Sequence, residues 1–261
     1  MWIGFAQMEV ARRKEDNLKK IKRFIRTERA DLIVFPEYCM GVDDKGINRR
    51  LVSSLAEPVD GPFVSGVLDV ASSNGATVVL PIYEKAKEGV YNSALLIEKG
   101  KLRGAYRKVN LFDALGYRES EFFSNGEKAV TFDLKDWRFG LMICYDLRFP
   151  ELARTLAHNG AEAILVPAGW FRGPNKEDNW ITLLKSRAQE NTVYMAGVGN
   201  CAKPFVGRSS LVAPDGVQEL DLGVGERFMA VELEKERIGR TRKALPVLQQ
   251  SRKASFWHES I

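Results

Sequence analysis

Residues 141–151 read Leu141-Met142-Ile143-Cys144-Tyr145-Asp146-Leu147-Arg148-Phe149-Pro150-Glu151. A nearly continuous apolar run ends at Cys144, and polar residues and a helix-start signal at Pro150 follow. This order predicts a buried strand with a thiol at its tip, followed by a turn into a helix. Ligands bind beyond the carboxyl ends of strands in open α/β sheets, so Cys144 is a candidate nucleophile. The alternative is an inert core cysteine, because free cysteines are often buried.

Apolar runs alternate with helical segments along the rest of the chain. Predicted strands cover 1–8, 32–35, 77–82, 163–166, 193–198 and 228–233. Predicted helices cover 14–28, 61–75, 150–158 and 178–190, and a short helix follows residue 233. Two predicted hairpins span 90–106 and 208–222, the second around Pro214-Asp215-Gly216. Continuous apolar runs between helices indicate buried parallel strands, and hairpins add antiparallel ones. We therefore predict an α/β fold, a four-layer α-β-β-α sandwich of two mixed sheets, in a single domain over residues 1–261.

Composition narrows the class of protein. The chain has 261 residues and a net charge of +5, with basic and acidic residues interspersed, which indicates a solvated surface and no nucleic-acid partner. No apolar stretch reaches membrane-span length, and the N-terminus lacks a basic n-region, so we expect a cytoplasmic protein without a membrane partner. Its three cysteines are widely spaced without a C-x-x-C pair, which disfavours disulfides and structural zinc. We expect no metal and no cofactor.

A cysteine nucleophile needs a base, and the usual partner is histidine. The only two histidines, His158 and His258, are expected at the surface, at a helix end and in the C-terminal tail. The base must then be a carboxylate, and Glu37 directly follows the apolar run 32–36. A desolvated glutamate has a raised pKa and can act as a general base near neutral pH. The alternative is an exposed loop glutamate.

A third candidate is Lys108, in the segment Tyr106-Arg107-Lys108-Val109-Asn110-Leu111-Phe112 after the first hairpin. Beside a thiol and a carboxylate, an ammonium lowers the pKa of the thiol and stabilises a developing oxyanion. The alternative is a solvated lysine with its stem along an apolar surface.

Five segments together carry a family resemblance. They are Phe35-Pro36-Glu37, the segment 106–112, the segment 144–151, Ser186-Arg187-Ala188-Gln189-Glu190-Asn191, and Gly207-Arg208-Ser209-Ser210 with its hairpin. In this order and spacing they resemble the nitrilase superfamily of carbon–nitrogen hydrolases over nearly the whole chain. The resemblance implies the α-β-β-α sandwich and a catalytic triad of Glu37, Lys108 and Cys144. It also implies a second glutamate that orients the lysine, for which Glu119 is the candidate and Glu121 a less suitable substitute.

The residues after the cysteine look like the branch of omega-amidases and deaminated-glutathione amidases, which hydrolyse a terminal carboxamide on small acids. The resemblance implies a thioester intermediate and release of ammonia. Candidate substrate contacts are Tyr145, Trp170 and Arg172, the last as a partner for a substrate carboxylate. Three departures from the branch leave the substrate open: Asn110 replaces its common histidine, the loop between Asp113 and Glu119 is short, and segment 168–174 is atypical.

Alternative functions remain. A nitrilase or an N-carbamoyl amino acid amidohydrolase would share the fold, and a non-catalytic interaction protein is less favoured because all four chemical residues are present. A nucleotide binder is weakly supported, since Gly197-Val198-Gly199 and Gly223-Val224-Gly225 are too short for a dinucleotide fingerprint. The tail 242–261, with Phe256 and Trp257, is expected at an oligomer interface, so we predict a homodimer or larger homo-oligomer.

Overall fold

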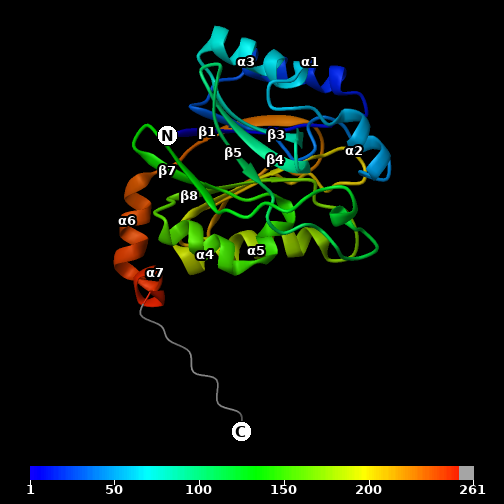
Figure 1. The fold of residues 1–261 in the computed structure, drawn as a ribbon. Coiled ribbons are helices and arrows are strands. Elements are labelled where there is room, and N and C mark those ends of the chain that lie inside the picture. The colour runs from blue at the N-terminus through cyan, green and yellow to red at the C-terminus, as the bar shows by residue number, and fades with distance from the viewer. Residues whose placement is uncertain (253–261) are drawn as a thin grey trace.

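Two six-stranded sheets pack face to face, with helices on both outer surfaces (Figure 1). The computed structural model describes residues 1–252; residues 253–261, with Phe256, Trp257 and His258 of the predicted tail, lie outside the described part. The first sheet consists, in spatial order, of β12 (Arg227–Glu232), β1 (Trp2–Gln7), β2 (Leu32–Val34), β3 (Thr77–Ala86), β4 (Gly89–Glu98) and β5 (Lys101–Arg107). The second consists of β11 (Gln218–Asp221), β10 (Ser210–Val212), β9 (Tyr194–Gly199), β8 (Ala163–Ala168), β7 (Trp137–Leu141) and β6 (Val130–Leu134). The predicted four-layer sandwich is confirmed.

The strand directions follow the apolar patterns. The central strands β1, β2 and β3 run parallel, as do β7, β8 and β9, and these strands are buried along most of their length. Strands covered on both faces need apolar side chains on both faces, which explains their continuous apolar runs. The hairpin strands β4–β5 and β10–β11 and the strands β12 and β6 add antiparallel pairs toward the edges. Each sheet is therefore mixed.

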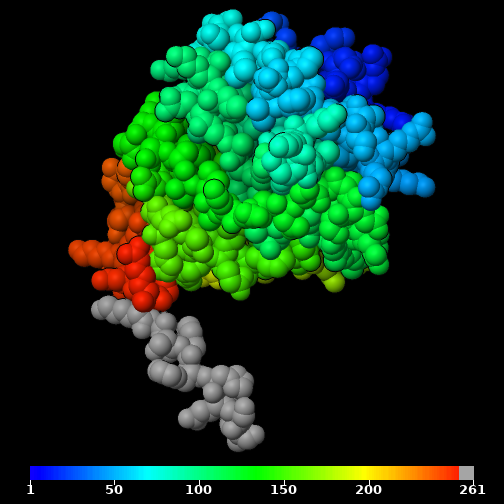
Figure 2. Space-filling model, in the orientation of Figure 1, coloured from blue at the N-terminus to red at the C-terminus, as the bar shows by residue number. Residues whose placement is uncertain are grey.

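The helices form the outer layers. The first sheet is covered by α1 (Lys14–Thr27) and α3 (Pro62–Asn74), and the second by α4 (Pro150–His158) and α5 (Lys176–Asn191) (Figure 1). Helix α3 begins with Pro62 in its first turn and ends at Gly75 in a left-handed conformation, as the sequence indicates. Three further helices are α2 (Arg49–Leu55), which was not predicted, α6 (Lys235–Ala244), where a short helix was expected, and α7 (Val247–Ser251). The last two lie along one flank of the molecule, orange to red in Figure 2.

Two apolar cores hold the layers together. One lies chiefly between the two sheets and beneath α4 and α5, and includes Phe5 and Val34 from the first sheet and Leu141 and Val166 from the second. The other lies between the first sheet and helices α1 and α3. No helix within residues 1–252 combines the length and apolar character that crossing a bilayer requires.

The topology brings three strand ends together. The parallel strands β2, β7 and β8 end at Val34, Leu141 and Ala168, and Glu37, Cys144 and Gly169 follow them within three residues. Lys108 directly follows β5. Residues distant in sequence thus reach one end of the sandwich, where the candidate site lies.

Candidate active site

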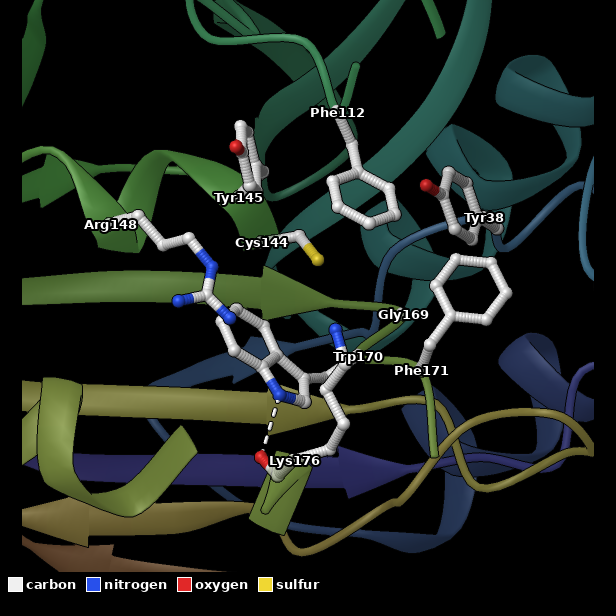
Figure 3. A pocket seen from close by; sticks show the side chains of 9 residues that line it. All are labelled: Tyr38, Phe112, Cys144, Tyr145, Arg148, Gly169, Trp170, Phe171 and Lys176. Carbon is white, nitrogen blue, oxygen red and sulfur yellow. Dashed lines mark hydrogen bonds between the residues drawn. The ribbon is translucent and has the colours of Figure 1, made fainter. Parts of the chain in front are cut away.

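Cys144 occupies a strained turn at the tip of the second sheet. After β7, Met142 and Ile143 continue as buried backbone, and Cys144 then adopts a left-handed conformation with φ of 48°. A short 3-10 helix (Cys144–Arg148) follows and leads into α4. Non-glycine residues held in this region cost free energy and concentrate at functional sites. The turn directs the sulfur into a pocket, as Figure 3 shows, while only 8% of the residue is exposed.

Asp146 holds this turn in place. Its Oδ2 accepts hydrogen bonds from the Ile143 N–H (2.9 Å) and the Tyr106 hydroxyl (2.6 Å). Its Oδ1 accepts from the backbone N–H and the side-chain amide of Asn110, at 2.8 and 2.9 Å. A fully buried carboxylate needs several such donors to offset lost hydration. Asp146 therefore ties the cysteine turn to the segment that carries Lys108.

Glu37 is fully buried and held by three donors. Its Oε1 accepts from the side-chain amide of Asn92 (2.7 Å) and from Lys108 Nζ (3.0 Å). Its Oε2 accepts from the backbone N–H of Gly169 at 2.7 Å. The carboxylate is thus fixed by groups from both sheets. Asn92 and Gly169 are neutral donors, so they orient Glu37 without adding charge.

Lys108 lies between two carboxylates. Besides Glu37, its Nζ donates to Glu119 Oε2 at 2.8 Å, and both the lysine and Glu119 are fully buried. Glu119 also accepts from the Tyr38 hydroxyl (2.6 Å) and the Phe112 N–H (2.7 Å). Glu121, the less suitable substitute, is exposed. The arrangement of Glu119 agrees with the expected orienting position beside the lysine.

Burial and charge together set the protonation of the site. Burial raises the pKa of the Cys144 thiol well above its ordinary value, Glu37 raises it further, and Lys108 opposes the rise. Burial also raises the pKa of Glu37, although Lys108 lowers it in part. For Lys108, burial alone would lower the pKa, but Glu119 and Glu37 outweigh it and hold the pKa above its ordinary value. The resting thiol therefore keeps its proton beside a strengthened base and a permanent cation.

The thiol opens into a small cavity, and Figure 3 shows its walls. The cavity is lined by Tyr38, Phe112, Cys144, Tyr145, Arg148, Gly169, Trp170, Phe171 and Lys176. Two of the three predicted substrate contacts, Tyr145 and Trp170, are among them. Arg172 is not: it is exposed, and its Nε donates to the Phe205 carbonyl at 2.6 Å. The cations that do face the cavity are Arg148 and Lys176.

The structure brings the four predicted chemical residues into one cluster, and it adds residues that the sequence analysis missed. These are Asn92, which donates to Glu37, Tyr38, which donates to Glu119, and Asp146, which holds the turn that carries Cys144. A usable signal existed for Asn92, which with Ser93 interrupts the apolar residues of β4. His158 lies apart, against Ser251 and Arg252 at the opposite end of α4 from the cysteine turn. Within residues 1–252, no group of three or more His, Cys, Asp or Glu side chains could hold a metal ion.

Comparison with known proteins identifies the family. The family model for carbon–nitrogen hydrolases matches residues 3–243. The chain is 35% identical to a deaminated glutathione amidase of Escherichia coli O157:H7 over 85% of this chain and 84% of that protein. It is 36% identical to an omega-amidase of Saccharomyces cerevisiae over 92% and 88%. The solved structure of an amidase variant from Nesterenkonia sp. AN1 superimposes with a TM-score of 0.78 at 26% identity, covering 94% of this chain and 98% of that one. The chain therefore belongs to the carbon–nitrogen hydrolases of the nitrilase superfamily, enzymes that act on carbon–nitrogen bonds other than peptide bonds.

Proposed function

We propose that the enzyme hydrolyses the terminal carboxamide of a small carboxylic acid and releases ammonia, with Cys144 as the nucleophile. One observation carries the proposal. A buried ammonium, Lys108, is hydrogen-bonded to both Glu37 and Glu119 beside the Cys144 thiol at the base of a small cavity. Such a set contains a nucleophile, a base and a preorganised cation for an oxyanion.

The relatives support this substrate class. The Escherichia coli and Saccharomyces cerevisiae proteins are a deaminated glutathione amidase and an omega-amidase. In the Nesterenkonia amidase variant, acrylamide has added to the active-site cysteine. A thiol that reacts with an amide-bearing molecule at the corresponding kind of site supports a cysteine nucleophile in this chain.

The first half of the reaction forms a thioester. Glu37 takes the proton from Cys144 as the sulfur attacks the amide carbon. The oxyanion that develops faces Lys108 Nζ and the backbone N–H of Tyr145. As the carbon–nitrogen bond breaks, Glu37 gives the proton to the leaving nitrogen, and ammonia departs. The raised pKa of Glu37 suits its roles as base and acid, because proton transfer is most efficient when the pKa of the catalytic group lies near the pH of the solution.

The second half consumes one water molecule. Glu37 takes a proton from water, the resulting hydroxide attacks the thioester carbon, and Lys108 again stabilises the oxyanion. The carbon–sulfur bond breaks, the thiolate recovers its proton from Glu37, and the carboxylic acid leaves. Glu119 keeps Lys108 protonated and oriented throughout.

The test is ammonia release from a panel of omega-amides, nitriles and N-carbamoyl amino acids. We expect omega-amides to be the best substrates, and mass spectrometry of the quenched reaction to detect an acyl group on Cys144. Lys108→Ala should lower kcat by at least about a hundredfold, because it removes an oxyanion donor and leaves two carboxylates unpaired. An active Cys144→Ala protein would overturn the proposal, and turnover of nitriles or carbamoyl compounds alone would redirect it to those chemistries.

Three broader expectations from the sequence also stay proposals. We infer that residues 1–261 form one catalytic domain, that the protein works in the cytoplasm, and that it assembles as a homodimer or larger through segment 242–261.

A further inference from the structure

Segment 186–191, at the end of helix α5, is one of the five segments that carry the family resemblance, yet none of its residues lines the cavity at Cys144. Its most unusual member is Arg187, which is only 6% exposed. Arginine side chains are almost never this buried unless they are paired. Arg187 shares the buried face of α5 with the apolar Trp180 and Leu184, so its charged group must have a partner inside the protein.

The Arg187 guanidinium connects α5 to the turn that carries the nucleophile. Its Nε donates to the backbone carbonyl of Leu147 at 3.1 Å, in a buried hydrogen bond. Leu147 is fully buried and belongs to the 3-10 helix that begins at Cys144. On its other side, Arg187 Nη1 pairs with the half-buried Glu190 Oε1 at 3.0 Å. One side chain therefore reaches from a carboxylate of α5 to the cysteine turn.

The Leu147 carbonyl depends on this contact because Pro150 removes the backbone alternative. In a 3-10 helix, a carbonyl accepts from the N–H three residues later, which for Leu147 is position 150. Proline has no N–H and also forces the preceding residue into extended backbone, and Phe149 has φ of −105° and ψ of 98°. Among residues 1–252, no backbone N–H donates to this carbonyl. A buried carbonyl without a donor costs free energy, and Arg187 supplies the donor.

Cys144 needs support on both sides of its strained backbone. Its φ of 48° lies in the left-handed region, which a residue other than glycine keeps only when its surroundings enforce it. On the N-terminal side, Asp146 Oδ2 holds the Ile143 N–H at 2.9 Å. On the C-terminal side, Arg187 holds the Leu147 carbonyl. These two side-chain contacts fix the chain just before and just after the nucleophile.

We propose that Arg187 is a positioning residue of the reaction. By holding the Leu147 carbonyl, it fixes the turn that directs the Cys144 sulfur and the Tyr145 N–H toward the substrate. Arg187 lies outside the cavity wall, so it acts through the turn and not on the reacting atoms. The inference rests on the proposed amidase function and adds to it a residue of a separate helix.

The activity test uses three substitutions on α5. Arg187→Met removes the donor and keeps an unbranched apolar stem. We expect its kcat for the best omega-amide of the panel to fall about tenfold to a hundredfold, because a small displacement of a reacting group has that effect. Arg187→Lys keeps a cation and a donor but not the planar geometry, and should recover part of the loss. Glu190→Gln removes the charge of the partner, leaves the contact with Leu147 in place, and should retain native kcat.

Alkylation of Cys144 by iodoacetamide separates positioning from amide hydrolysis. The sulfur displaces iodide and loses its proton to solvent, and no carbon–nitrogen bond breaks. Mass spectrometry of the Cys144 peptide distinguishes this thiol from Cys39 and Cys201. We expect Arg187→Met to slow the alkylation about tenfold or more. The control for stability is Asn17→Ala, a change at a buried asparagine whose side chain bonds Ala11. It should keep the native rate at a temperature at which circular dichroism shows each variant to be folded.

The two measurements fail separately. If the native protein hydrolyses no amide but Arg187→Met slows alkylation and Asn17→Ala does not, the proposed function fails and the positioning role stands. If amides are hydrolysed and a folded Arg187→Met protein keeps the native kcat and alkylation rate, the positioning role is overturned and the amidase stands. An equal loss in Asn17→Ala would also overturn the role, because the effect would then follow stability. Should Arg187→Met not fold, Arg187→Lys decides: reduced rates support the role, and native rates in both measurements reject it.

Discussion

The Glu37 carboxylate is held in one orientation by three donors, of which one is charged and two are neutral. Lys108 contributes charge, while Gly169 and Asn92 contribute neutral hydrogen bonds. Donors to the ionised form of an acid lower its pKa, and burial raises it. For Glu37 burial prevails, so its pKa lies above the ordinary value of 4.5. The Asn92 bond therefore moderates the basicity that burial creates.

Asn92→Ala removes a donor to the ionised carboxylate, so the pKa of Glu37 should rise further. Because the reaction needs the ionised form, activity is lost as pH falls through this pKa. We expect the acid limb of the kcat/KM profile to move to higher pH, and kcat/KM near pH 7 to fall about tenfold to a hundredfold through misorientation of Glu37. Initial rates of ammonia release across a pH series measure both effects.

A structural role alone would not move the acid limb, and Asn17 provides the comparison. Asn17 is equally buried, its side chain bonds both backbone groups of Ala11, and neither residue lines the cavity at Cys144. Asn17→Ala should lower the melting temperature and leave the acid limb in place. An acid limb that stays fixed in a folded Asn92→Ala protein would contradict the positioning role.

At the level of elements, helix α5 approaches strand β9 closely because Gly197 has no side chain. A Cβ atom at Gly197 would lie 2.4 Å from Cζ2 of Trp180, which is almost fully buried. Gly197→Ala should therefore lower the free energy of unfolding by roughly 1–3 kcal/mol, as overpacking of a core does. Gly104→Ala in β5 is the control, because nothing lies within 4 Å of its Cβ position. Urea unfolding of both variants measures the difference, and equal stabilities would refute the packing argument.

The sequence predicts those helices and strands in which the pattern of apolar residues follows directly from which faces are buried. Helix α4 has the predicted bounds, and the thiol and the glutamate lie beyond strand tips as expected. Strand β3 runs past its predicted end at residue 82, because it stays paired with β4 as far as Ala86. Pro81, which lacks an N–H, does not interrupt it, since the pairing with β2 involves only Val78 and Val79. Strand β6 pairs with β7 but was not predicted, since its residues are only partly buried and lack a clear apolar run.

The walls of the cavity were harder to predict than its chemical groups. Cys144, Glu37, Lys108 and Glu119 belong to motifs with recognisable neighbours. Lys176 is one charged residue in a polar segment, and only the left-handed Asn175 and the first turn of α5 direct it inward. Arg172 carries the same charge four residues earlier and faces outward. Composition and spacing cannot distinguish these two cations, because the loop conformation decides the direction of each.

At the level of the whole molecule, the site forms only when the two sheets pack together. Glu37 and Lys108 follow strands of the first sheet, and Cys144 and Gly169 follow strands of the second. The hydrogen bond from Gly169 to Glu37 crosses between the layers. Loss of packing between the sheets would therefore separate the base from the nucleophile.

The whole molecule is also predicted to assemble as a homodimer or larger homo-oligomer. Leu245, between α6 and α7, is 58% exposed beside the half-buried Val247 and Leu248. We expect light scattering at micromolar concentration to give at least twice the chain mass of 29.4 kDa. Leu245→Asp should shift the population toward monomer, because a charge in an apolar interface is costly. Leu102→Asp, at an exposed leucine of strand β5, should not. A native protein that scatters as a monomer would count against the prediction.

Two buried carboxylates share the single ammonium of Lys108, so this buried trio carries a net negative charge when all three groups are ionised. In the proposed reaction the amide carbon ends as a new carboxylate next to Glu37. Like charges in a poorly hydrated space repel strongly, so the finished acid is expelled from the position that the neutral amide had occupied. Inhibition by product should consequently be weak near neutral pH, and amide resynthesis from acid and ammonia should require acidic solution, in which the carboxyl group enters uncharged.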